Sequence, residues 1–192
     1  MNPFRDLIRR VRAGEEAAAA ELVQQYEPYL RRAVRVRMVD PRLKRLIDSM
    51  DICQSVLASF FVRAALGQYD LNSPEELLKL LVTMARNKLN NVVARERAER
   101  RDYRRNQKAG DFMPAADDTP SQLAAARELL EKFRENLTTE ERQIADLRAK
   151  GCEWTEIAAQ LGGTPEARRK KLARALDRIG QQLGLEPEAP RG

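Results

Sequence analysis

Apolar residues recur every three or four positions along the first half of the chain, which is the spacing of one helix face. Four such runs predict helices over residues 4–13, 15–39, 48–66 and 74–94. Pro28 lies inside the second run, where its missing backbone N–H predicts a kink or a boundary. The third run has two candidate N-caps, Ser49 and Asp51.

The second half is also predicted to be helical, after a break in the pattern. Residues 106–121 lack periodicity and contain two prolines, a glycine and three aspartates, a composition typical of a linker. Further helices are predicted over residues 122–136, 138–150, 153–161 and 165–183. The predicted fold class is therefore all-α, with two small helical domains, 1–105 and 122–192, joined by a flexible linker at 106–121.

The last helices have the order of a helix-turn-helix. A stop at Gly151 is followed by a short helix, the tight turn 162–165 and a basic helix. Gly162 suits a left-handed turn position, and the second helix of such a motif reads base edges with residues near its N-terminus. A helical hairpin without DNA contact is the alternative. The residues predicted to face DNA are Thr164, Glu166, Ala167, Arg168, Arg169, Lys170, Lys171 and Arg174.

Basic residues gather in two tracts of a chain whose formal net charge is +6. Residues 86–108 hold nine basic and three acidic residues, and residues 165–179 hold six basic and two acidic ones. A polyanion bound by both tracts would release counterions from each, so the pattern favours nucleic acid as a partner. Solvated helix faces are the alternative interpretation.

The composition argues against an enzyme. Histidine is absent, which excludes Ser-His-Asp and Cys-His sites and histidine-ligated zinc. The two cysteines, Cys53 and Cys152, cannot complete a zinc site without histidine, so no metal or cofactor is expected. The acidic pairs are adjacent residues at helix starts or in the linker, where they act as caps rather than as a general acid and base. No apolar segment is long enough for a signal or a membrane span, so a cytoplasmic protein without membrane insertion is expected.

Five short motifs, in this order, resemble one protein family. They occupy residues 51–57, 84–87, 137–142, 154–158 and 171–175. Together with the intervening linker they resemble the extracytoplasmic-function (ECF) group of sigma factors, the minimal two-domain members of the sigma-70 family. The resemblance covers residues 4–183. It implies a transcription initiation factor with core RNA polymerase and promoter DNA as partners, and members of the group are often held inactive by an anti-sigma protein.

The resemblance also implies roles for individual residues. The helix carrying Asp51 would dock on the clamp helices of RNA polymerase, the loop 67–74 would capture an unpaired base, and the last helix would read the −35 element in duplex DNA. The implied polymerase-binding residues are Asp51, Gln54, Ser55 and Phe61. The implied −10 residues are Tyr69, Asn72, Arg86, Asn87, Lys88, Asn91 and Arg95.

The leading hypothesis is therefore an alternative sigma factor that selects and opens promoters. Two other classes stay open at this point. One is an ordinary DNA-binding regulator that uses only the terminal helix-turn-helix and does not associate with polymerase. The other is a helical adaptor for an acidic protein partner. Association with core polymerase in the absence of DNA separates the first hypothesis from both alternatives.

Overall fold

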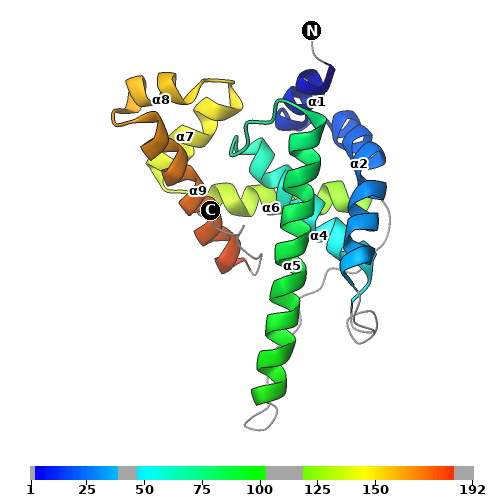
Figure 1. Ribbon diagram of the computed structural model, residues 1–192. Coiled ribbons are helices and arrows are strands. Elements are labelled where there is room, and N and C mark those ends of the chain that lie inside the picture. Colours follow the sequence, from blue (N-terminus) through cyan, green and yellow to red (C-terminus); the bar gives the residue numbers. More distant parts are fainter. Residues whose placement is uncertain (1–2, 39–46, 103–118, 184–192) are drawn as a thin grey trace.

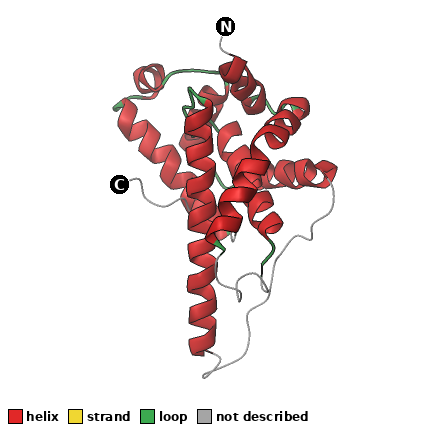
Figure 2. Ribbon diagram, turned by 45° about the vertical axis from the view of Figure 1, so that its right-hand side comes forward, coloured by secondary structure: helices red, strands yellow, loops and turns green. Residues whose placement is uncertain are grey.

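Every secondary-structure element in the described residues is an α-helix (Figures 1 and 2). The computed structural model describes residues 3–38, 47–102 and 119–183. The helices are α1 (Pro3–Arg12), α2 (Glu16–Arg37), α4 (Ser49–Ala65), α5 (Pro74–Asp102), α6 (Thr119–Glu135), α7 (Thr139–Ala149), α8 (Trp154–Leu161) and α9 (Pro165–Gln182). The all-α prediction is therefore confirmed. No helix in these ranges is long and apolar enough to cross a bilayer.

The first four helices pack around one hydrophobic cluster. Each helix contributes the stripe of apolar side chains that its sequence spacing predicts, and the four stripes meet in this cluster. Its fully enclosed members include Leu22, Leu30, Phe60, Leu77 and Leu81. Burying each such side chain contributes about 1.5–3 kcal/mol. Beyond the cluster, α5 continues past the rest of the bundle (Figure 1).

The structure narrows one local expectation in this half and overturns another. Pro28 does not mark a helix boundary, because helix α2 runs through it. Pro28 and Gln24, whose carbonyl loses its usual donor, are both exposed, so solvent can replace the missing hydrogen bond. The N-cap of α4 is neither Ser49 nor Asp51: the Asp48 side chain accepts from the backbone N of Met50 at 3.0 Å. The backbone of Asp48 is extended, as an N-cap requires.

Helices α6 to α9 build a second cluster, and α4 belongs to both. Phe133, Ile144 and Leu176 are buried together in this second cluster. Val62 and Leu66, near the end of α4, are buried in the same cluster. In Figure 1, α6 passes α4 and reaches towards α2. Helix α4 is therefore packed on two sides, by α1, α2 and α5 on one and by α6 on the other.

Charged contacts also join the two halves. The guanidinium of Arg63 on α4 donates to Asp177 of α9 at 2.9 Å. Arg148 of α7 donates to the carbonyl of Gly67 at 3.1 Å and to the carboxylate of Asp70. Arg63 and Arg148 are only 1% and 2% exposed, so both charges are enclosed where the halves meet.

The predicted linker is described only at its end. Helix α6 begins at Thr119, so residues 119–121 of the predicted linker span are helical. Residues 103–118 lie outside the described residues. The boundaries 1–105 and 122–192 therefore stay a prediction.

We predict that Thr138→Ala destabilises the second half by about 1 kcal/mol, because Thr138 closes the capping box of α7. Its hydroxyl accepts from the backbone N of Glu141 at 3.4 Å, and the Glu141 carboxylate accepts from the backbone N of Thr138 at 2.9 Å. Urea unfolding followed by circular dichroism measures the loss. The matched control is Thr139→Ala, at the exposed next position. Equal midpoints for the two variants would contradict the capping role.

Candidate nucleic-acid interface

The turn between α8 and α9 is built by its glycines and a threonine cap. Gly162 and Gly163 have φ angles of 78° and 80°, the left-handed region that the sequence predicted for Gly162. The hydroxyl of Thr164 then accepts from the backbone N of Ala167 at 3.1 Å and starts α9. Pro165, the first residue of the helix, has no N–H to leave unpaired. These residues fix how α9 leaves the turn.

Arg168 is turned inward, although the sequence predicted that it faces DNA. Its Nε donates to the Gly162 carbonyl at 2.7 Å, and its Nη2 donates to the Leu161 carbonyl at 2.5 Å. Its Nη1 donates to Glu140 of α7. The side chain is 12% exposed. In this arrangement Arg168 secures the turn against α7, and its charge is already neutralised.

Glu140 also pairs with Lys171, the next basic residue on that side of α9. Hydrogen bonds from Lys171 and Arg168 hold the pKa of the Glu140 carboxyl below its ordinary value. The carboxylate therefore stays ionised at neutral pH and neutralises part of the basic tract. This pairing reduces the charge that Lys171 can offer to a phosphate.

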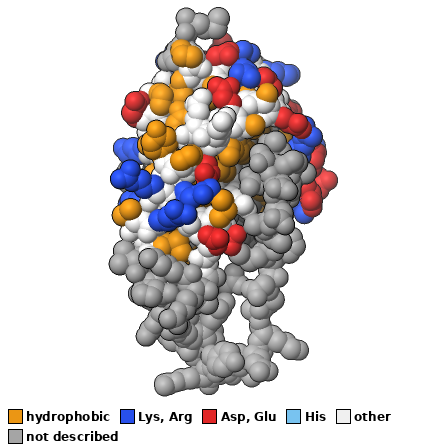
Figure 3. Space-filling model, turned by 90° about the vertical axis from the view of Figure 1, so that its right-hand side faces the viewer, with side chains coloured by type: hydrophobic (Ala, Val, Ile, Leu, Met, Phe, Trp, Pro, Cys, Tyr) orange, Lys and Arg blue, Asp and Glu red, His pale blue; other side chains and the backbone are white. Residues whose placement is uncertain are grey.

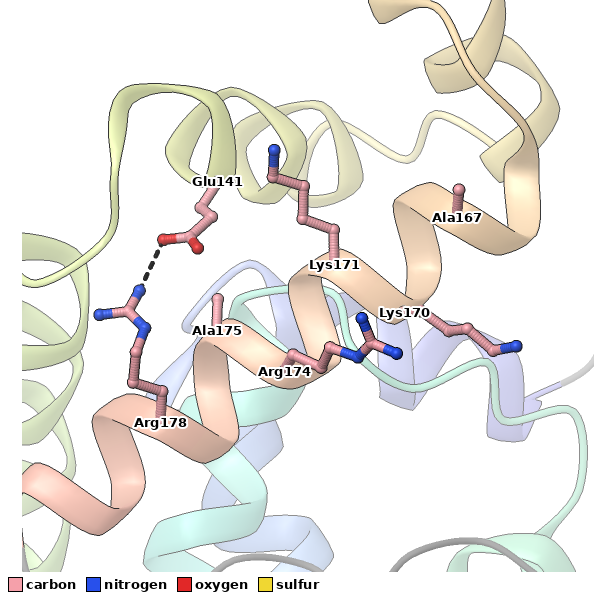
Figure 4. A pocket seen from close by; sticks show the side chains of 7 residues that line it. All are labelled: Glu141, Ala167, Lys170, Lys171, Arg174, Ala175 and Arg178. Carbon is pink, nitrogen blue, oxygen red and sulfur yellow. Dashed lines mark hydrogen bonds and ion pairs between the residues drawn. The ribbon is translucent and has the colours of Figure 1, made fainter.

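Four basic side chains of α9 line an open hollow of about 580 Å³, and they are Lys170, Lys171, Arg174 and Arg178. Figure 4 shows Lys170 and Arg174 on one side of the helix and Arg178 near Glu141 of α7. Arg178 donates to Glu141 at 2.8 Å. Among the described residues Arg174 forms no ion pair, and its side chain is exposed. The hollow is therefore a mainly cationic surface, and basic side chains of this kind are the usual partners of backbone phosphates.

Arg178 was missed by the sequence reasoning. It follows Arg174 by one helical turn, so the two share a face of α9. The four-residue spacing of Arg174 and Arg178 in the sequence could have identified Arg178 as part of this surface. Glu166 was predicted at this surface, and it pairs with Lys170 at 3.5 Å and with Arg169 at 3.8 Å. These exposed pairs are weak and can yield to a phosphate.

The predicted −10 residues on α5 lie on more than one side of the helix. Asn87 and Asn91 are four residues apart and share a face, with Lys88 beside them, whereas Arg86 is exposed on a different face. The Nδ2 of Asn87 is enclosed and has no hydrogen-bond partner among the described residues. An amide donor that is buried without a partner costs free energy of folding. The side chain of Arg95 lies outside the described residues.

The loop between α4 and α5 packs its tyrosine into the core of the first half. The ring of Tyr69 is 2% exposed and stacks on Phe60, with the ring centroids 5.8 Å apart and the planes 8° from parallel. In this arrangement no base can stack on Tyr69, which is part of the core. Asn72 is exposed, and its backbone N donates to Glu76 at 2.8 Å.

The predicted polymerase-binding residues of α4 are all half-buried. Asp51, Gln54 and Ser55 lie in the first two turns. Phe61 packs against the first cluster, edge-on to Phe60 at a centroid distance of 5.6 Å. Phe61 therefore contributes to packing as well as to the outer surface.

Helix α2 exposes two large hydrophobic side chains, Tyr29 and Val36, which are 61% and 67% exposed. They are seven residues apart and share a helix face. Figure 3 looks onto the side of the molecule that carries α2, where hydrophobic and basic side chains lie next to one another. Isolated surface hydrophobics are common, so this face by itself assigns no function.

The cysteines form no reactive site in the described residues. Cys53 is buried in the first cluster, and burial raises the pKa of its thiol to about 12, with a smaller contribution from Glu27. The thiol therefore stays protonated at neutral pH. Cys152 is half-buried and packs against the second cluster. No group of three His, Cys, Asp or Glu in the described ranges is arranged to hold a metal ion.

Comparison with known proteins places this arrangement in a family. The family model described as ECF sigma factor matches residues 1–184, which include both basic tracts and all the helices above. Searches of curated proteins and of solved structures gave no significant match. Members of the matched family are non-enzymatic transcription factors that act with RNA polymerase. The chain belongs to the ECF sigma factor family.

Proposed function

We propose that this chain is an alternative sigma factor that binds core RNA polymerase and directs it to promoters with defined −10 and −35 elements. The observation that carries the proposal is the family match over residues 1–184, because it includes the candidate docking helix and both candidate DNA surfaces. Each half then has a separate task. The first half docks on polymerase and reads the −10 element, and the second half reads the −35 element.

Docking is assigned to α4, through Asp51, Gln54, Ser55 and Phe61. Asp51 lies in the first turn of the helix, where the positive end of the helix dipole favours a carboxylate. A basic surface on the polymerase would then meet this end of α4. Side chains of this chain that are already held on a rigid helix lose little conformational entropy when they bind a partner.

Recognition of the −10 element is assigned to α5 and the loop before it. An asparagine side chain can both donate to and accept from a base edge, and Asn87 and Asn91 share a half-buried face of α5. Asn72 is exposed at the loop and can meet an unpaired base directly. Contacts made only to the separated strand favour the melted promoter over the duplex.

Recognition of the −35 element is assigned to the helix-turn-helix of α8 and α9. Arg169, Lys170 and Arg174 supply the exposed charge, while Arg168 sets the angle of α9 by its bonds to the turn. Phosphate contacts position such a helix, and base-edge contacts near its N-terminus give it specificity.

We predict that the chain associates with core RNA polymerase without DNA and that Asp51→Arg weakens this association at least tenfold. The reversed charge would meet like charge on the partner, which costs about 1.4 kcal/mol or more for a tenfold loss. Titration of labelled chain with core polymerase measures the affinity. Glu75→Arg, an equal charge reversal at an exposed site on α5, is the control. Undiminished affinity of Asp51→Arg would exclude α4 as the docking helix, and no association of any variant would favour a regulator that works without polymerase.

Arg174→Ala is expected to weaken binding of duplex DNA similarly for all sequences and to lower the slope of log K against log salt by about one. The reason is that Arg174 offers an unpaired charge at the hollow. Lys150→Ala, which removes an exposed charge at the end of α7, is the control. An unchanged salt slope for Arg174→Ala would show that phosphate does not bind there.

Asn87→Ala should reduce transcription from a duplex promoter more than it reduces binding to an isolated −35 duplex, because only the former uses the −10 surface. Run-off transcription with purified core polymerase and a mobility-shift assay give the two values. The exposed neighbour Asn90 supplies the control variant Asn90→Ala. Equal losses in both assays would contradict the assignment of Asn87 to the −10 element.

A further inference from the structure

The last three turns of α2 carry a third group of basic side chains. Residues 28–37 contain four arginines and no acidic residue. Three of these arginines, Arg32, Arg35 and Arg37, are exposed. They lie outside the basic tracts 86–108 and 165–179, and none of them belongs to the docking, −10 or −35 residues. This end of α2 therefore has a concentrated positive charge that no assigned role uses.

The exposed arginines of α2 are not neutralised by carboxylates of the described residues. Arg32 and Arg35 form no ion pair with any residue in those ranges. Arg37 donates to a carbonyl of its own helix at 3.3 Å, which leaves its charge uncompensated. Glu27, the last acidic residue of α2, pairs with Arg31 at 2.5 Å. An anion that reaches this end of α2 would therefore not compete with a carboxylate of the described residues.

An aromatic and an aliphatic side chain accompany these charges. Tyr29, Arg32 and Val36 are separated by three and four residues, which places them on one stripe of the helix. Tyr29 and Val36 are the large hydrophobic side chains that the described residues expose. Leu22 precedes Tyr29 by seven residues on the same side of α2, and it is fully buried. The side of α2 that is covered in the first half of the helix is thus open in the second half.

An exposed aromatic ring beside guanidinium groups is a surface typical of single-stranded nucleic acid. Guanidinium groups donate in pairs to phosphate oxygens, and an exposed ring can stack on an unpaired base. Duplex DNA would use the arginines only, because its bases are already stacked on one another. Tyr69, the tyrosine that the sequence predicted to stack on a base, is buried against Phe60, whereas Tyr29 is exposed.

The position of α2 also favours a DNA strand over an acidic protein. Helix α2 packs directly against α5, which carries the proposed −10 residues (Figure 1). Basic and hydrophobic side chains lie next to one another on the side of the molecule that carries α2 (Figure 3). A strand separated at α5 would therefore need only a short path to reach the end of α2.

We propose that the exposed end of α2 binds the separated promoter strand next to the −10 element. Tyr29 stacks on an unpaired base, and Arg32 and Arg35 bind the phosphates on either side. This inference rests on the proposed function, because a sigma factor is what brings an open strand to the first half. The contact is independent of base sequence, since every base offers a face for stacking.

Photo-crosslinking identifies the occupant of this surface directly. The complex contains the full chain, core RNA polymerase and a promoter with mismatched, permanently unpaired bases around the −10 element. Tyr29→p-benzoylphenylalanine places the reactive group at the proposed stacking position. Ala17→p-benzoylphenylalanine, at an exposed position near the start of the same helix, is the control. A crosslink from position 29 to one DNA strand is expected, with none from position 17. A crosslink to a polymerase subunit, or to no partner, would overturn the proposal.

Substitutions separate the stacking from the charge. Tyr29→Ala should weaken binding of the mismatched promoter about fivefold or more, and Tyr29→Phe, which keeps the ring, should bind as wild type does. Arg32→Ala combined with Arg35→Ala should lower the slope of log K against log salt by about 1.4, because each phosphate contact on a single strand contributes about 0.7. Arg5→Ala, which removes an exposed charge from α1, is the control and should leave the slope unchanged.

Each result that departs from these expectations counts against the proposal. No loss with Tyr29→Ala, or equal losses with Tyr29→Ala and Tyr29→Phe, would overturn the stacking role. An unchanged salt slope for the double arginine variant would overturn the phosphate contacts. In either case, binding of core polymerase by the wild-type chain would leave the proposed function intact. Failure of the wild-type chain to bind core polymerase would instead overturn the proposed function on which this inference rests.

Discussion

Two buried guanidinium groups determine how the halves of this chain meet. Arg63 comes from the first half and Arg148 from the second, and each has its carboxylate partner in the other half. A charge removed from water is costly unless a partner compensates it, and breaking such a pair in place leaves an uncompensated charge. The halves are therefore stable either with both contacts made or fully apart, when water solvates the charges. This constraint favours two discrete arrangements over a continuous range.

Helix α4 links the packing of the two halves to the proposed function. It supplies side chains to both hydrophobic clusters, and the family to which the chain belongs acts with RNA polymerase. In the proposed function, polymerase docks on the half-buried side chains of the first turns of α4, whose buried side chains hold the clusters together. Contact with DNA through α9 depends on local pairing, such as that of Glu140 with Lys171.

Local patterns predicted the helices, although not the N-cap of α4, and contacts between distant residues could not be predicted in the same way. The helices follow from the spacing of apolar residues, and the observed caps at Thr138 and Thr164 depend only on neighbours within three residues. By contrast, Arg148 and Asp70 are 78 residues apart, and no periodicity links them. Arg168 shows the same limit within a predicted surface: its residue type and position favour DNA contact, but the carbonyls of the turn and Glu140 lie closer. The roles of the other surface residues depend on partners and stay predictions.

The most direct test of the account is transcription in vitro with purified core RNA polymerase, followed by mapping of the start sites on genomic DNA. The account predicts that core polymerase supplied with this chain starts at defined sites that share −10 and −35 elements. Start sites that do not change when the chain is added would contradict it.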